Sequence, residues 1–214
     1  MTGRILAIGD IHGCNGLLKR LLDQIRIDPL ADTLICIGDY LDRGPEVRGA
    51  IDTLLELKET GANLICLKGN HESMFLNYYL DGRDEELFLI NGGQSTLDSY
   101  GISRDDARKG RGYPENHLRF LTSLPLSHEA GEYFFVHAGL RPGIALTGQS
   151  PEDLLWIRYE FIDSDWEFGR TVVFGHTPLP EPLLEKNKIG IDTGAVYGGR
   201  LTCIELPSRR IIQV

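Results

Sequence analysis

The sequence predicts an α/β protein, since short apolar runs alternate with helical patterns through its first 70 residues. Residues 5–8, 34–37 and 64–67 are runs of four apolar side chains that a glycine follows within two positions, as is typical of buried strands. Because the runs are continuously apolar rather than alternating, we expect a sheet that is covered on both faces.

Helical patterns fill the gaps between these strands. Apolar residues at 18, 21, 22 and 25 have the spacing of one helix face, and residues 47–55 follow a similar pattern between Pro45 and Gly61. The order is therefore β-α-β-α-β, with successive strand ends about 30 residues apart, as in βαβ units. Right-handed crossovers make such strands parallel, so that their carboxyl ends meet at one edge of the sheet.

The remainder of the chain supplies further elements around this core. Residues 72–127 are expected to form helices and loops, and strand-like runs resume at 133–136 and 171–174. Shorter β candidates lie around 188–192, 200–206 and 210–214. A chain of 214 residues buries roughly 70% of its extended surface on folding, and no linker or repeat divides it, so we expect one domain over residues 1–214.

Composition and charge exclude several classes of protein. With 22 Lys and Arg against 31 Asp and Glu, the net charge of −9 argues against a broad basic surface that binds nucleic acid. The apolar runs are far too short to span a membrane, and the first residues lack the apolar core of a signal peptide. The four cysteines are scattered without a CxxC pair. We therefore expect a cytoplasmic protein with reduced thiols and no membrane or nucleic-acid partner.

Side chains that bind metals follow five of the strand-like runs. They are Asp10 with His12, Asp39, Asn70, His137 and His176. Asp, Asn and His together suit Mn²⁺, Fe or Zn²⁺, and the absence of thiolates disfavours a structural zinc site. The number of ligands suits two metal ions about 3.5–4 Å apart that share a bridging carboxylate.

Three blocks of sequence resemble the signature motifs of the phosphoprotein phosphatase family of metallophosphoesterases. They are GDIHG at 9–13, GDYLDRG at 38–44 and GNHE at 69–72. The later histidine motifs of the family have similar counterparts in HAG at 137–139 and GHT at 175–177. Its small bacterial and bacteriophage (lambda-type) members have motifs similar to LWIR at 155–158, IDTGAVYGG at 191–199 and NGGQST at 91–96. The sequence assigns no chemistry to the last of these.

The resemblance implies a β-sandwich flanked by helices and a role for each matching residue. One metal ion would be held by Asp10, His12 and Asp39, and the other by Asp39, Asn70, His137 and His176. Asp39 would bridge the two ions. His71 would be the general acid, oriented by Asp42, while Arg43 and Arg158 would bind phosphate oxygens. We expect two divalent ions, with Mn²⁺ first and Fe or Zn²⁺ as alternatives that the sequence does not distinguish.

Such a site suits the hydrolysis of phosphate monoesters. Two divalent ions lower the pKa of a bridging water, and the resulting hydroxide attacks phosphorus in line. Guanidinium groups match the geometry of the phosphate oxygens, and a histidine beside Asn70 is placed to protonate the leaving alkoxide. We therefore expect a monomeric serine/threonine protein phosphatase that acts on phosphoproteins, with phosphotyrosine and small phosphoesters as further substrates.

Three other functions fit parts of the pattern. A diadenosine tetraphosphatase-like hydrolase uses the same site on a dinucleotide polyphosphate, although such relatives are longer chains. A metallophosphoesterase nuclease fits poorly with the charge of −9 and the DRG motif. A metal-stabilised binding module without activity would be expected to lack a ligand or His71, and none is missing. Substrate recognition is expected in variable loops such as 78–115, which do not identify the substrate.

Residues 14–20 also fit the C-x5-R phosphate loop of cysteine-dependent phosphatases. A position near a helix start could lower the pKa of Cys14. However, the segment continues directly into an amphipathic helix, which argues against a phosphate loop. We also expect Glu72 to be a helix-start carboxylate, and His117 and His128 to have no catalytic role.

Overall fold

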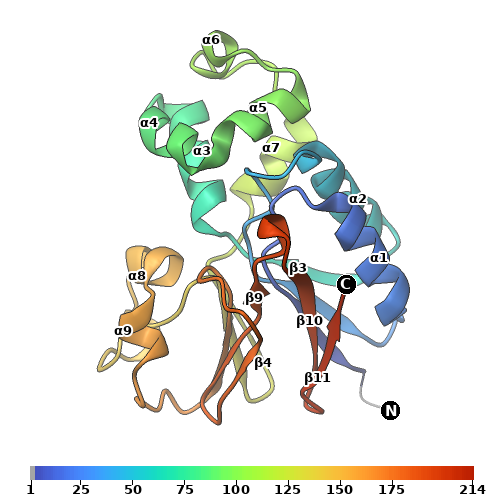
Figure 1. Ribbon diagram of the computed structural model, residues 1–214, viewed down its shortest axis with the longest axis vertical. Helices are drawn as coiled ribbons and strands as arrows, with labels where there is room; N and C mark the ends of the chain where they lie inside the picture. Colours follow the sequence, from blue (N-terminus) through green and yellow to red (C-terminus); the bar gives the residue numbers. More distant parts are fainter. Residues whose placement is uncertain (1–2) are drawn as a thin grey trace.

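Two β-sheets lie face to face in the computed structural model, which describes residues 3–214 (Figure 1). The first sheet has the order β11-β10-β1-β2-β3, with β9 paired to β10. Its strands are β1 (Ile5–Ile8), β2 (Thr33–Cys36), β3 (Asn63–Cys66), β9 (Asp192–Thr193), β10 (Arg200–Leu206) and β11 (Arg210–Gln213). The second sheet has the order β4-β5-β6-β8-β7. Its strands are β4 (Ser127–Ala130), β5 (Tyr133–Val136), β6 (Thr171–Phe174), β7 (Leu183–Leu184) and β8 (Lys188–Gly190).

Helices cover the outer faces of both sheets and one end of the sandwich (Figure 1). Beside the first sheet lie α1 (Asn15–Ile25) and α2 (Val47–Glu59), and beside the second lie α8 (Pro151–Trp156) and α9 (Tyr159–Ile162). A helical lobe, residues 70–122, stands above the sandwich. It contains α3 (Asn70–Asp81), α4 (Glu85–Phe88), the π-helical segment η1 (Leu89–Gly93), α5 (Gln94–Tyr100), α6 (Arg104–Ala107) and α7 (Glu115–Thr122). Two short 3-10 turns are η2 (Leu146–Gly148) and η3 (Ala195–Tyr197).

The predicted α/β class and the sandwich flanked by helices are confirmed. β1, β2 and β3 are parallel, with Ile8 beside Cys36 and Cys36 beside Cys66. The strands predicted at 34–37 and 64–67 begin and end one residue earlier than expected. The sequence does not predict β4 or β7, because the SHEA segment of β4 has no apolar run and β7 has only two residues.

Apolar side chains form three stacked layers. The middle layer lies between the sheets and includes Ile35 of the first sheet and Phe135 and Val173 of the second. The two outer layers join the helices to the sheets, with Leu18 of α1 in one and Phe161 of α9 in the other. Because each sheet is buried on both faces, its strands are continuously apolar, which is the pattern that the sequence shows. Within residues 3–214, no helix is long and apolar enough to cross a membrane.

The chain is packed tightly where β1 ends. A Cβ atom at Gly9 would lie only 2.3 Å from the carbonyl oxygen of Ile191, which follows β8. The amide of Gly9 also donates to the Thr202 carbonyl of β10 at 3.0 Å. Only glycine fits this position. The next residue, Asp10, therefore lies at the junction between the sheets.

Replacing Gly9 with Ala should destabilise the protein by about 2–3 kcal/mol, because the added methyl group meets backbone that cannot yield easily. Denaturation in urea measures the change. Gly16→Ala in α1 is the matched control, since its Cβ would meet only the Oε2 atom of Glu46 at 3.7 Å. The control should be neutral or gain up to about 1 kcal/mol from helix propensity. Equal stability of the two variants would contradict this account of the junction.

Candidate metal centre

The structure brings all six predicted metal ligands together at the carboxyl ends of strands from both sheets. Asp10 and His12 follow β1, Asp39 follows β2, Asn70 begins α3, His137 follows β5 and His176 follows β6. All six are at most 4% exposed. The Nε2 atom of His137 lies 2.9 Å from Oδ1 of Asn70, although the two residues are 67 positions apart. The predicted ligand set is therefore one buried cluster.

Asp39 lies at the centre of this cluster. Its Oδ2 atom is 3.4 Å from Nε2 of His12, and its Oδ1 atom is 3.4 Å from Nε2 of His137. Two groups of side chains share Asp39, and within each group the possible ligand atoms lie within 4.8 Å of one another. One group is His12, Asp39 and His71, and the other is Asp39, His137 and His176. The two oxygens of one carboxylate thus face two sets of ligands, as a bridging carboxylate does. The first group contains His71, the predicted general acid, and not Asp10.

The backbone of His176, which follows β6 of the second sheet, holds Asp10. Both of its carboxylate oxygens accept the His176 amide at 3.1 Å. Burial, and after it the neighbouring Asp192 and Asp39 carboxylates, raise the pKa of Asp10 well above its usual value. Asp192 is itself 5% exposed, and burial raises its pKa too. The sequence places Asp192 in a family motif but does not reveal that it lies beside Asp10.

The histidines are arranged as metal ligands are. Nδ1 of His12 lies 2.7 Å from the Leu41 carbonyl, and Nδ1 of His137 lies 2.9 Å from the Ile37 carbonyl. These contacts place the proton on Nδ1 and leave Nε2 unprotonated, as a metal ligand must be. Burial lowers the pKa of His137 to about 3 and that of His12 well below its usual value, so both rings are neutral.

Two further features fit a cation at this position. Within residues 3–214, Nε2 of His176 is the buried side-chain nitrogen that finds no hydrogen-bond partner. Burial also raises the pKa of Asp39 well above its usual value, because carboxylates without a counter-charge are costly to bury. A set of neutral imidazoles, carboxylates and one amide oxygen suits a borderline or hard divalent metal. The residues present therefore fit the two predicted ions.

His71 and Asp42 form a tight buried pair beside these ligands. Nδ1 of His71 lies 2.6 Å from Oδ2 of Asp42, as the predicted orienting role requires. The hydroxyl of Thr96 donates to Oδ1 of Asp42 and accepts its backbone amide at 3.0 Å. Burial raises the pKa of Asp42 to about 8 against the opposing effects of Thr96 and Arg43, and burial lowers the pKa of His71.

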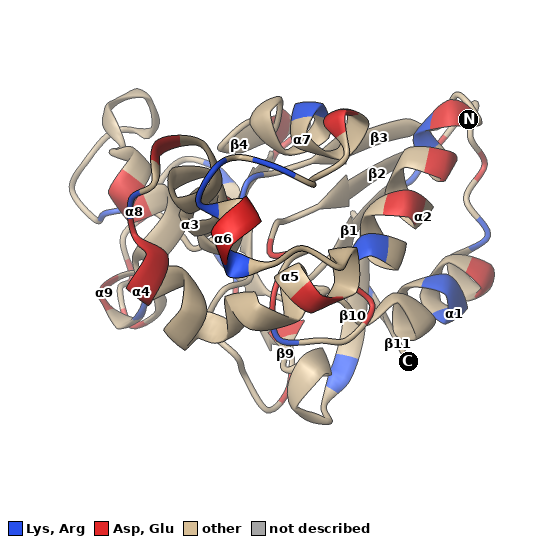
Figure 2. Ribbon diagram, turned by 90° about the horizontal axis from the view of Figure 1, so that it is seen from above, with Lys and Arg blue, Asp and Glu red and all other residues tan. Residues whose placement is uncertain are grey.

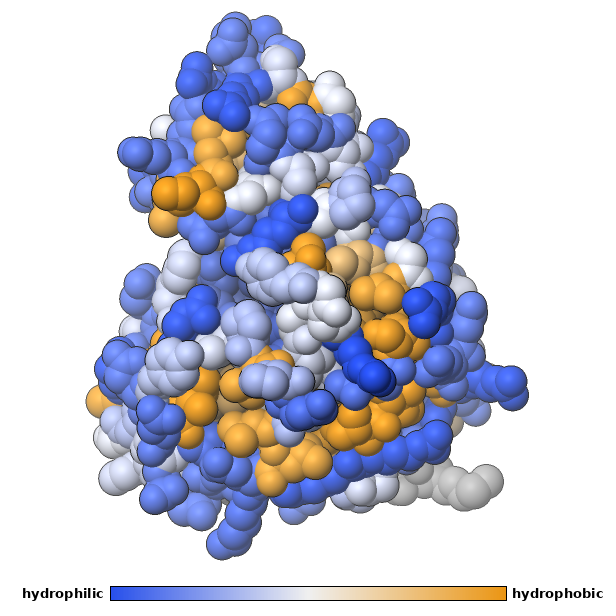
Figure 3. Space-filling view, viewed as in Figure 1, coloured by the Kyte–Doolittle hydropathy of each residue, from blue (hydrophilic) through white to orange (hydrophobic). Residues whose placement is uncertain are grey.

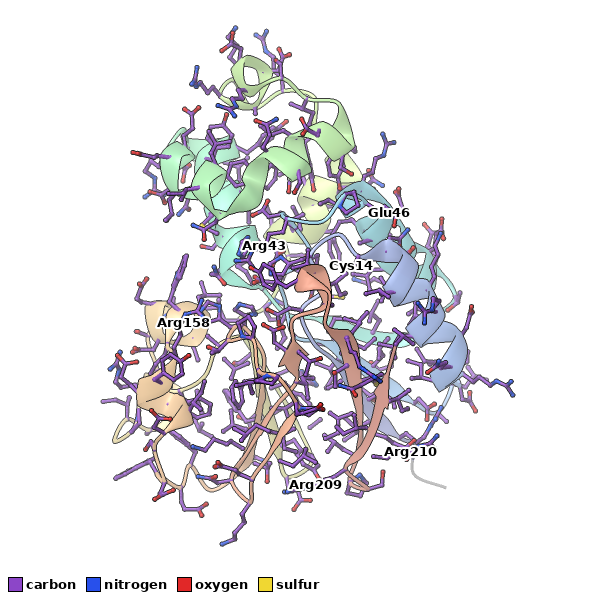
Figure 4. All side chains as sticks on the ribbon, viewed as in Figure 1. Cys14, Arg43, Glu46, Arg158, Arg209 and Arg210 are labelled. Atoms are coloured by element: carbon purple, nitrogen blue, oxygen red, sulfur yellow. The ribbon has the colours of Figure 1, made fainter. Side chains whose placement is uncertain are left out.

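The two predicted phosphate-binding arginines come from different layers of the fold (Figure 4). Arg43 follows β2, and its Nη1 atom contacts Nε2 of His12, while its guanidinium lies 5.5 Å from the ring of Tyr197. Arg158 precedes α9 and donates to the His176 carbonyl at 3.2 Å and to the Thr177 hydroxyl at 3.3 Å. Two positive charges thus border the ligand cluster from opposite sheets.

Glu72 holds the loop that carries the shared carboxylate. Its Oε1 atom accepts the amides of Tyr40 and Leu41 at 2.8 and 3.1 Å, and its Oε2 atom accepts those of Asp39 and Gly69 at 2.9 Å each. Burial raises the pKa of Glu72 to about 7, and these hydrogen bonds oppose the rise. The sequence predicts only a helix-start carboxylate, because contacts with residues 32 positions away leave no local pattern.

The NGGQST motif, to which the sequence assigned no chemistry, supports Asp42 and Arg43. The Gly92 carbonyl accepts the Arg43 amide at 3.2 Å, and Thr96 binds Asp42 as described. A Cβ atom at Gly92, whose φ is +97°, would lie 2.9 Å from Cγ of Arg43. The glycine is therefore required for the lobe to approach the arginine.

A nucleophilic cysteine needs a lowered pKa, which Cys14 does not have. Burial and the nearby Glu46 carboxylate raise its pKa rather than lower it, so the sequence-based expectation of a lowered value is wrong. Its Sγ atom lies 3.7 Å from the His12 carbonyl. Figure 4 shows Cys14 at the start of α1 beside Glu46. A cysteine-based mechanism has no support from this geometry.

The chain belongs to the calcineurin-like phosphoesterase family, whose model matches residues 3–201. Members of this family use divalent metal ions, in agreement with the donor set described above. The chain is therefore a phosphoesterase hydrolase of the metal-dependent class.

Several curated proteins are similar to the chain along most of its length. Serine/threonine-protein phosphatase 1 of Salmonella typhimurium is 32% identical over 203 residues, which cover 92% of this chain and 89% of the relative. An asymmetrical bis(5'-nucleosyl)-tetraphosphatase of Anoxybacillus flavithermus is 28% identical over 232 residues, covering 97% and 92%. A symmetrical enzyme of that type from Aromatoleum aromaticum is 27% identical over 281 residues, covering 98% and 96%.

Solved structures share the fold. A candidate diadenosine tetraphosphatase has a TM-score of 0.77 and 26% identity, and the match covers 100% of this chain and 94% of that one. A cold-active protein tyrosine phosphatase has a TM-score of 0.71 at 19% identity, covering 100% and 76%. At that identity the second match supports the fold alone.

Replacing Glu72 with Gln should destabilise the protein by about 3–5 kcal/mol, since the new amide group would face two backbone N–H donors in a buried site. Binding of Mn²⁺, measured by calorimetry, should weaken as well, because the loop carrying Asp39 loses its support. Glu86→Gln in the exposed helix α4 is the control and should change neither quantity. Wild-type stability and metal affinity in the Glu72 variant would refute the supporting role.

Proposed function

We propose that this phosphoesterase is a serine/threonine protein phosphatase that hydrolyses phosphate monoesters with two divalent metal ions. The observation that carries the proposal is the sharing of Asp39 between two ligand groups, with His71 and two arginines around them. Asp10, His12 and Asp39 would hold one ion, and Asp39, Asn70, His137 and His176 the other. Bound there, the ions would act as Lewis acids that make water a better nucleophile and neutralise the phosphate.

The chain's own residues bind the phosphate and move a proton. Arg43 and Arg158 would bind phosphate oxygens from two sides, because guanidinium forks match the geometry of a phosphate group. The leaving alkoxide needs a proton, which His71 would supply through Nε2. That atom lies 3.8 Å from Oδ2 of Asp39, and thus at the ligand cluster, while Nδ1 is held by Asp42. Asp42 would keep the ring in one orientation and, when ionised, would stabilise its protonated form.

Relatives of both kinds match the chain, and alignment length is the reason for which we place a phosphoprotein first. The matches with the two tetraphosphatases extend over 232 and 281 positions, more than the 214 residues of this chain, so those relatives contain segments that it lacks. The match with the Salmonella typhimurium phosphatase needs only 203 positions. A dinucleotide polyphosphate is the second candidate substrate, because proteins named for that activity match nearly the whole chain.

The metal that we propose is Mn²⁺, with Fe and Zn²⁺ as alternatives that the same nitrogen and oxygen donors accept. Stripping the protein with a chelator and restoring each ion separately, with a phosphoserine peptide and diadenosine tetraphosphate as parallel substrates, tests metal and substrate together. We expect the highest kcat/KM with Mn²⁺ on the phosphopeptide. A higher value on the dinucleotide would establish the second candidate instead, and turnover that resists the chelator would refute both.

Replacing His71 with Asn should lower kcat about 10²–10⁴-fold on an alkyl phosphate such as phosphoserine, as expected for loss of a general acid. The loss should be much smaller on p-nitrophenyl phosphate, whose leaving group departs without protonation. Steady-state kinetics on both esters measure the difference. His117→Asn is the control, since that ring contacts Tyr100 and Asp52 rather than the ligand cluster. Equal losses on both esters would rule out the acid role.

A further inference from the structure

A shallow surface groove lies along one face of the continuous helical stretch formed by α4 and η1. It is widely open to solvent and has a volume of roughly 540 Å³. The lining residues are Glu85, Glu86, Leu89 and Ile90. None of them belongs to the metal centre or to the motifs of the family.

Apolar side chains of the groove and of the lobe around it face solvent. Ile90, which lines the groove, is 80% exposed, and Leu87 and Leu80, which do not line it, are 42% and 52% exposed. Figure 3 shows orange side chains gathered at the lower edge of this lobe, above the narrowing between the lobe and the sandwich. Exposed aliphatic groups that gather in this way mark interaction surfaces.

The same segment is fixed to the phosphate-binding side of the metal centre. The Gly92 carbonyl accepts the Arg43 amide at 3.2 Å, and a Cβ atom at Gly92 would lie 2.9 Å from Cγ of Arg43. Ile90 is two residues from Gly92, so their Cα atoms are at most about 7 Å apart. The lining residue Ile90 therefore lies close along the chain to the backbone contact that supports Arg43.

The charge of the groove is negative. Glu85 is paired with Arg108 at 2.7 Å, whereas Glu86 has no ion-pair partner within residues 3–214. The first two residues of α4 are glutamates, which Figure 2 shows in red, and basic segments lie elsewhere on the lobe. An aliphatic wall with one unpaired carboxylate suits a ligand that carries an apolar and a basic group, and it disfavours a second anionic phosphate.

We propose that this groove binds the polypeptide that flanks the phosphorylated residue of a protein substrate, through one aliphatic and one basic side chain. The proposal rests on the proposed function, since it needs a protein substrate. Ile90 would contact the aliphatic side chain and Glu86 the basic one. These two residues would determine which phosphoproteins bind, while the reaction itself would depend on the metal centre.

Three substrates and two variants test the proposal. The substrates are a phosphoserine peptide with Leu and Arg near the phosphate, the same peptide with Glu in place of Arg, and p-nitrophenyl phosphate. Ile90→Asp should raise KM for the first peptide about tenfold, as expected for loss of one buried aliphatic contact, with kcat unchanged. Glu86→Lys should reverse the preference between the two peptides. Neither variant should alter kcat/KM on p-nitrophenyl phosphate, and Leu184→Asp on the distant strand β7 should alter nothing.

Each other outcome overturns a defined part of the inference. If the wild-type protein hydrolyses the phosphopeptides and both variants retain its KM values, the groove is not a substrate site, while the proposed function stands. If the wild-type protein hydrolyses only p-nitrophenyl phosphate or a dinucleotide, the protein-phosphatase function fails and the groove proposal with it. A wild-type dimer that Ile90→Asp dissociates, seen by light scattering, would show that a second copy of the chain occupies the groove. Melting curves confirm that the variants are folded.

Discussion

The structure of the site depends on the burial of several carboxylates at the junction of two sheets. Asp10, Asp39 and Asp192 are nearly inaccessible to water, and burial raises the pKa of each. Buried anions are costly unless they are paired or bind metal ions. The histidines around them are neutral and cannot supply the missing charge. Divalent ions can, and the same ions would attract a phosphate dianion to a protein whose net charge is −9.

The backbone is strained at this junction and held there by the surrounding structure. Five of the eight non-glycine residues with positive φ within residues 3–214 are predicted site residues: His12, Asp39, Asp42, Arg43 and His176. Such conformations cost free energy and persist only where neighbouring contacts enforce them. Glu72 provides three of those contacts to the loop at Asp39, and the Gly92 carbonyl provides another to Arg43. The catalytic geometry is thus maintained by residues that need not touch a substrate.

The sequence predicts the strands and the residues that gather in the ligand cluster, because both leave local patterns. Continuous apolar runs show β1, β5 and β6, and short motifs mark every residue of the ligand cluster. The supporting residues are different, since their roles depend on distant contacts. Thr96 reaches Asp42 across 54 positions, and Asp192 of β9 meets Asp10, which follows β1, although the two are far apart in the sequence. The groove at α4 is also invisible in the sequence, because exposed Ile90 has the same local pattern as a buried residue.

The bridging role of Asp39 is the central claim, and metal content tests it most directly. Asn is nearly isosteric with Asp and tolerates the positive φ of 52° at this position, so Asp39→Asn should keep the fold, as circular dichroism would verify. After reconstitution with Mn²⁺ and removal of excess ions, elemental analysis should find two ions per wild-type chain and at most one per variant chain. Two tightly bound ions in the variant, or only one in the wild-type protein, would contradict the claim.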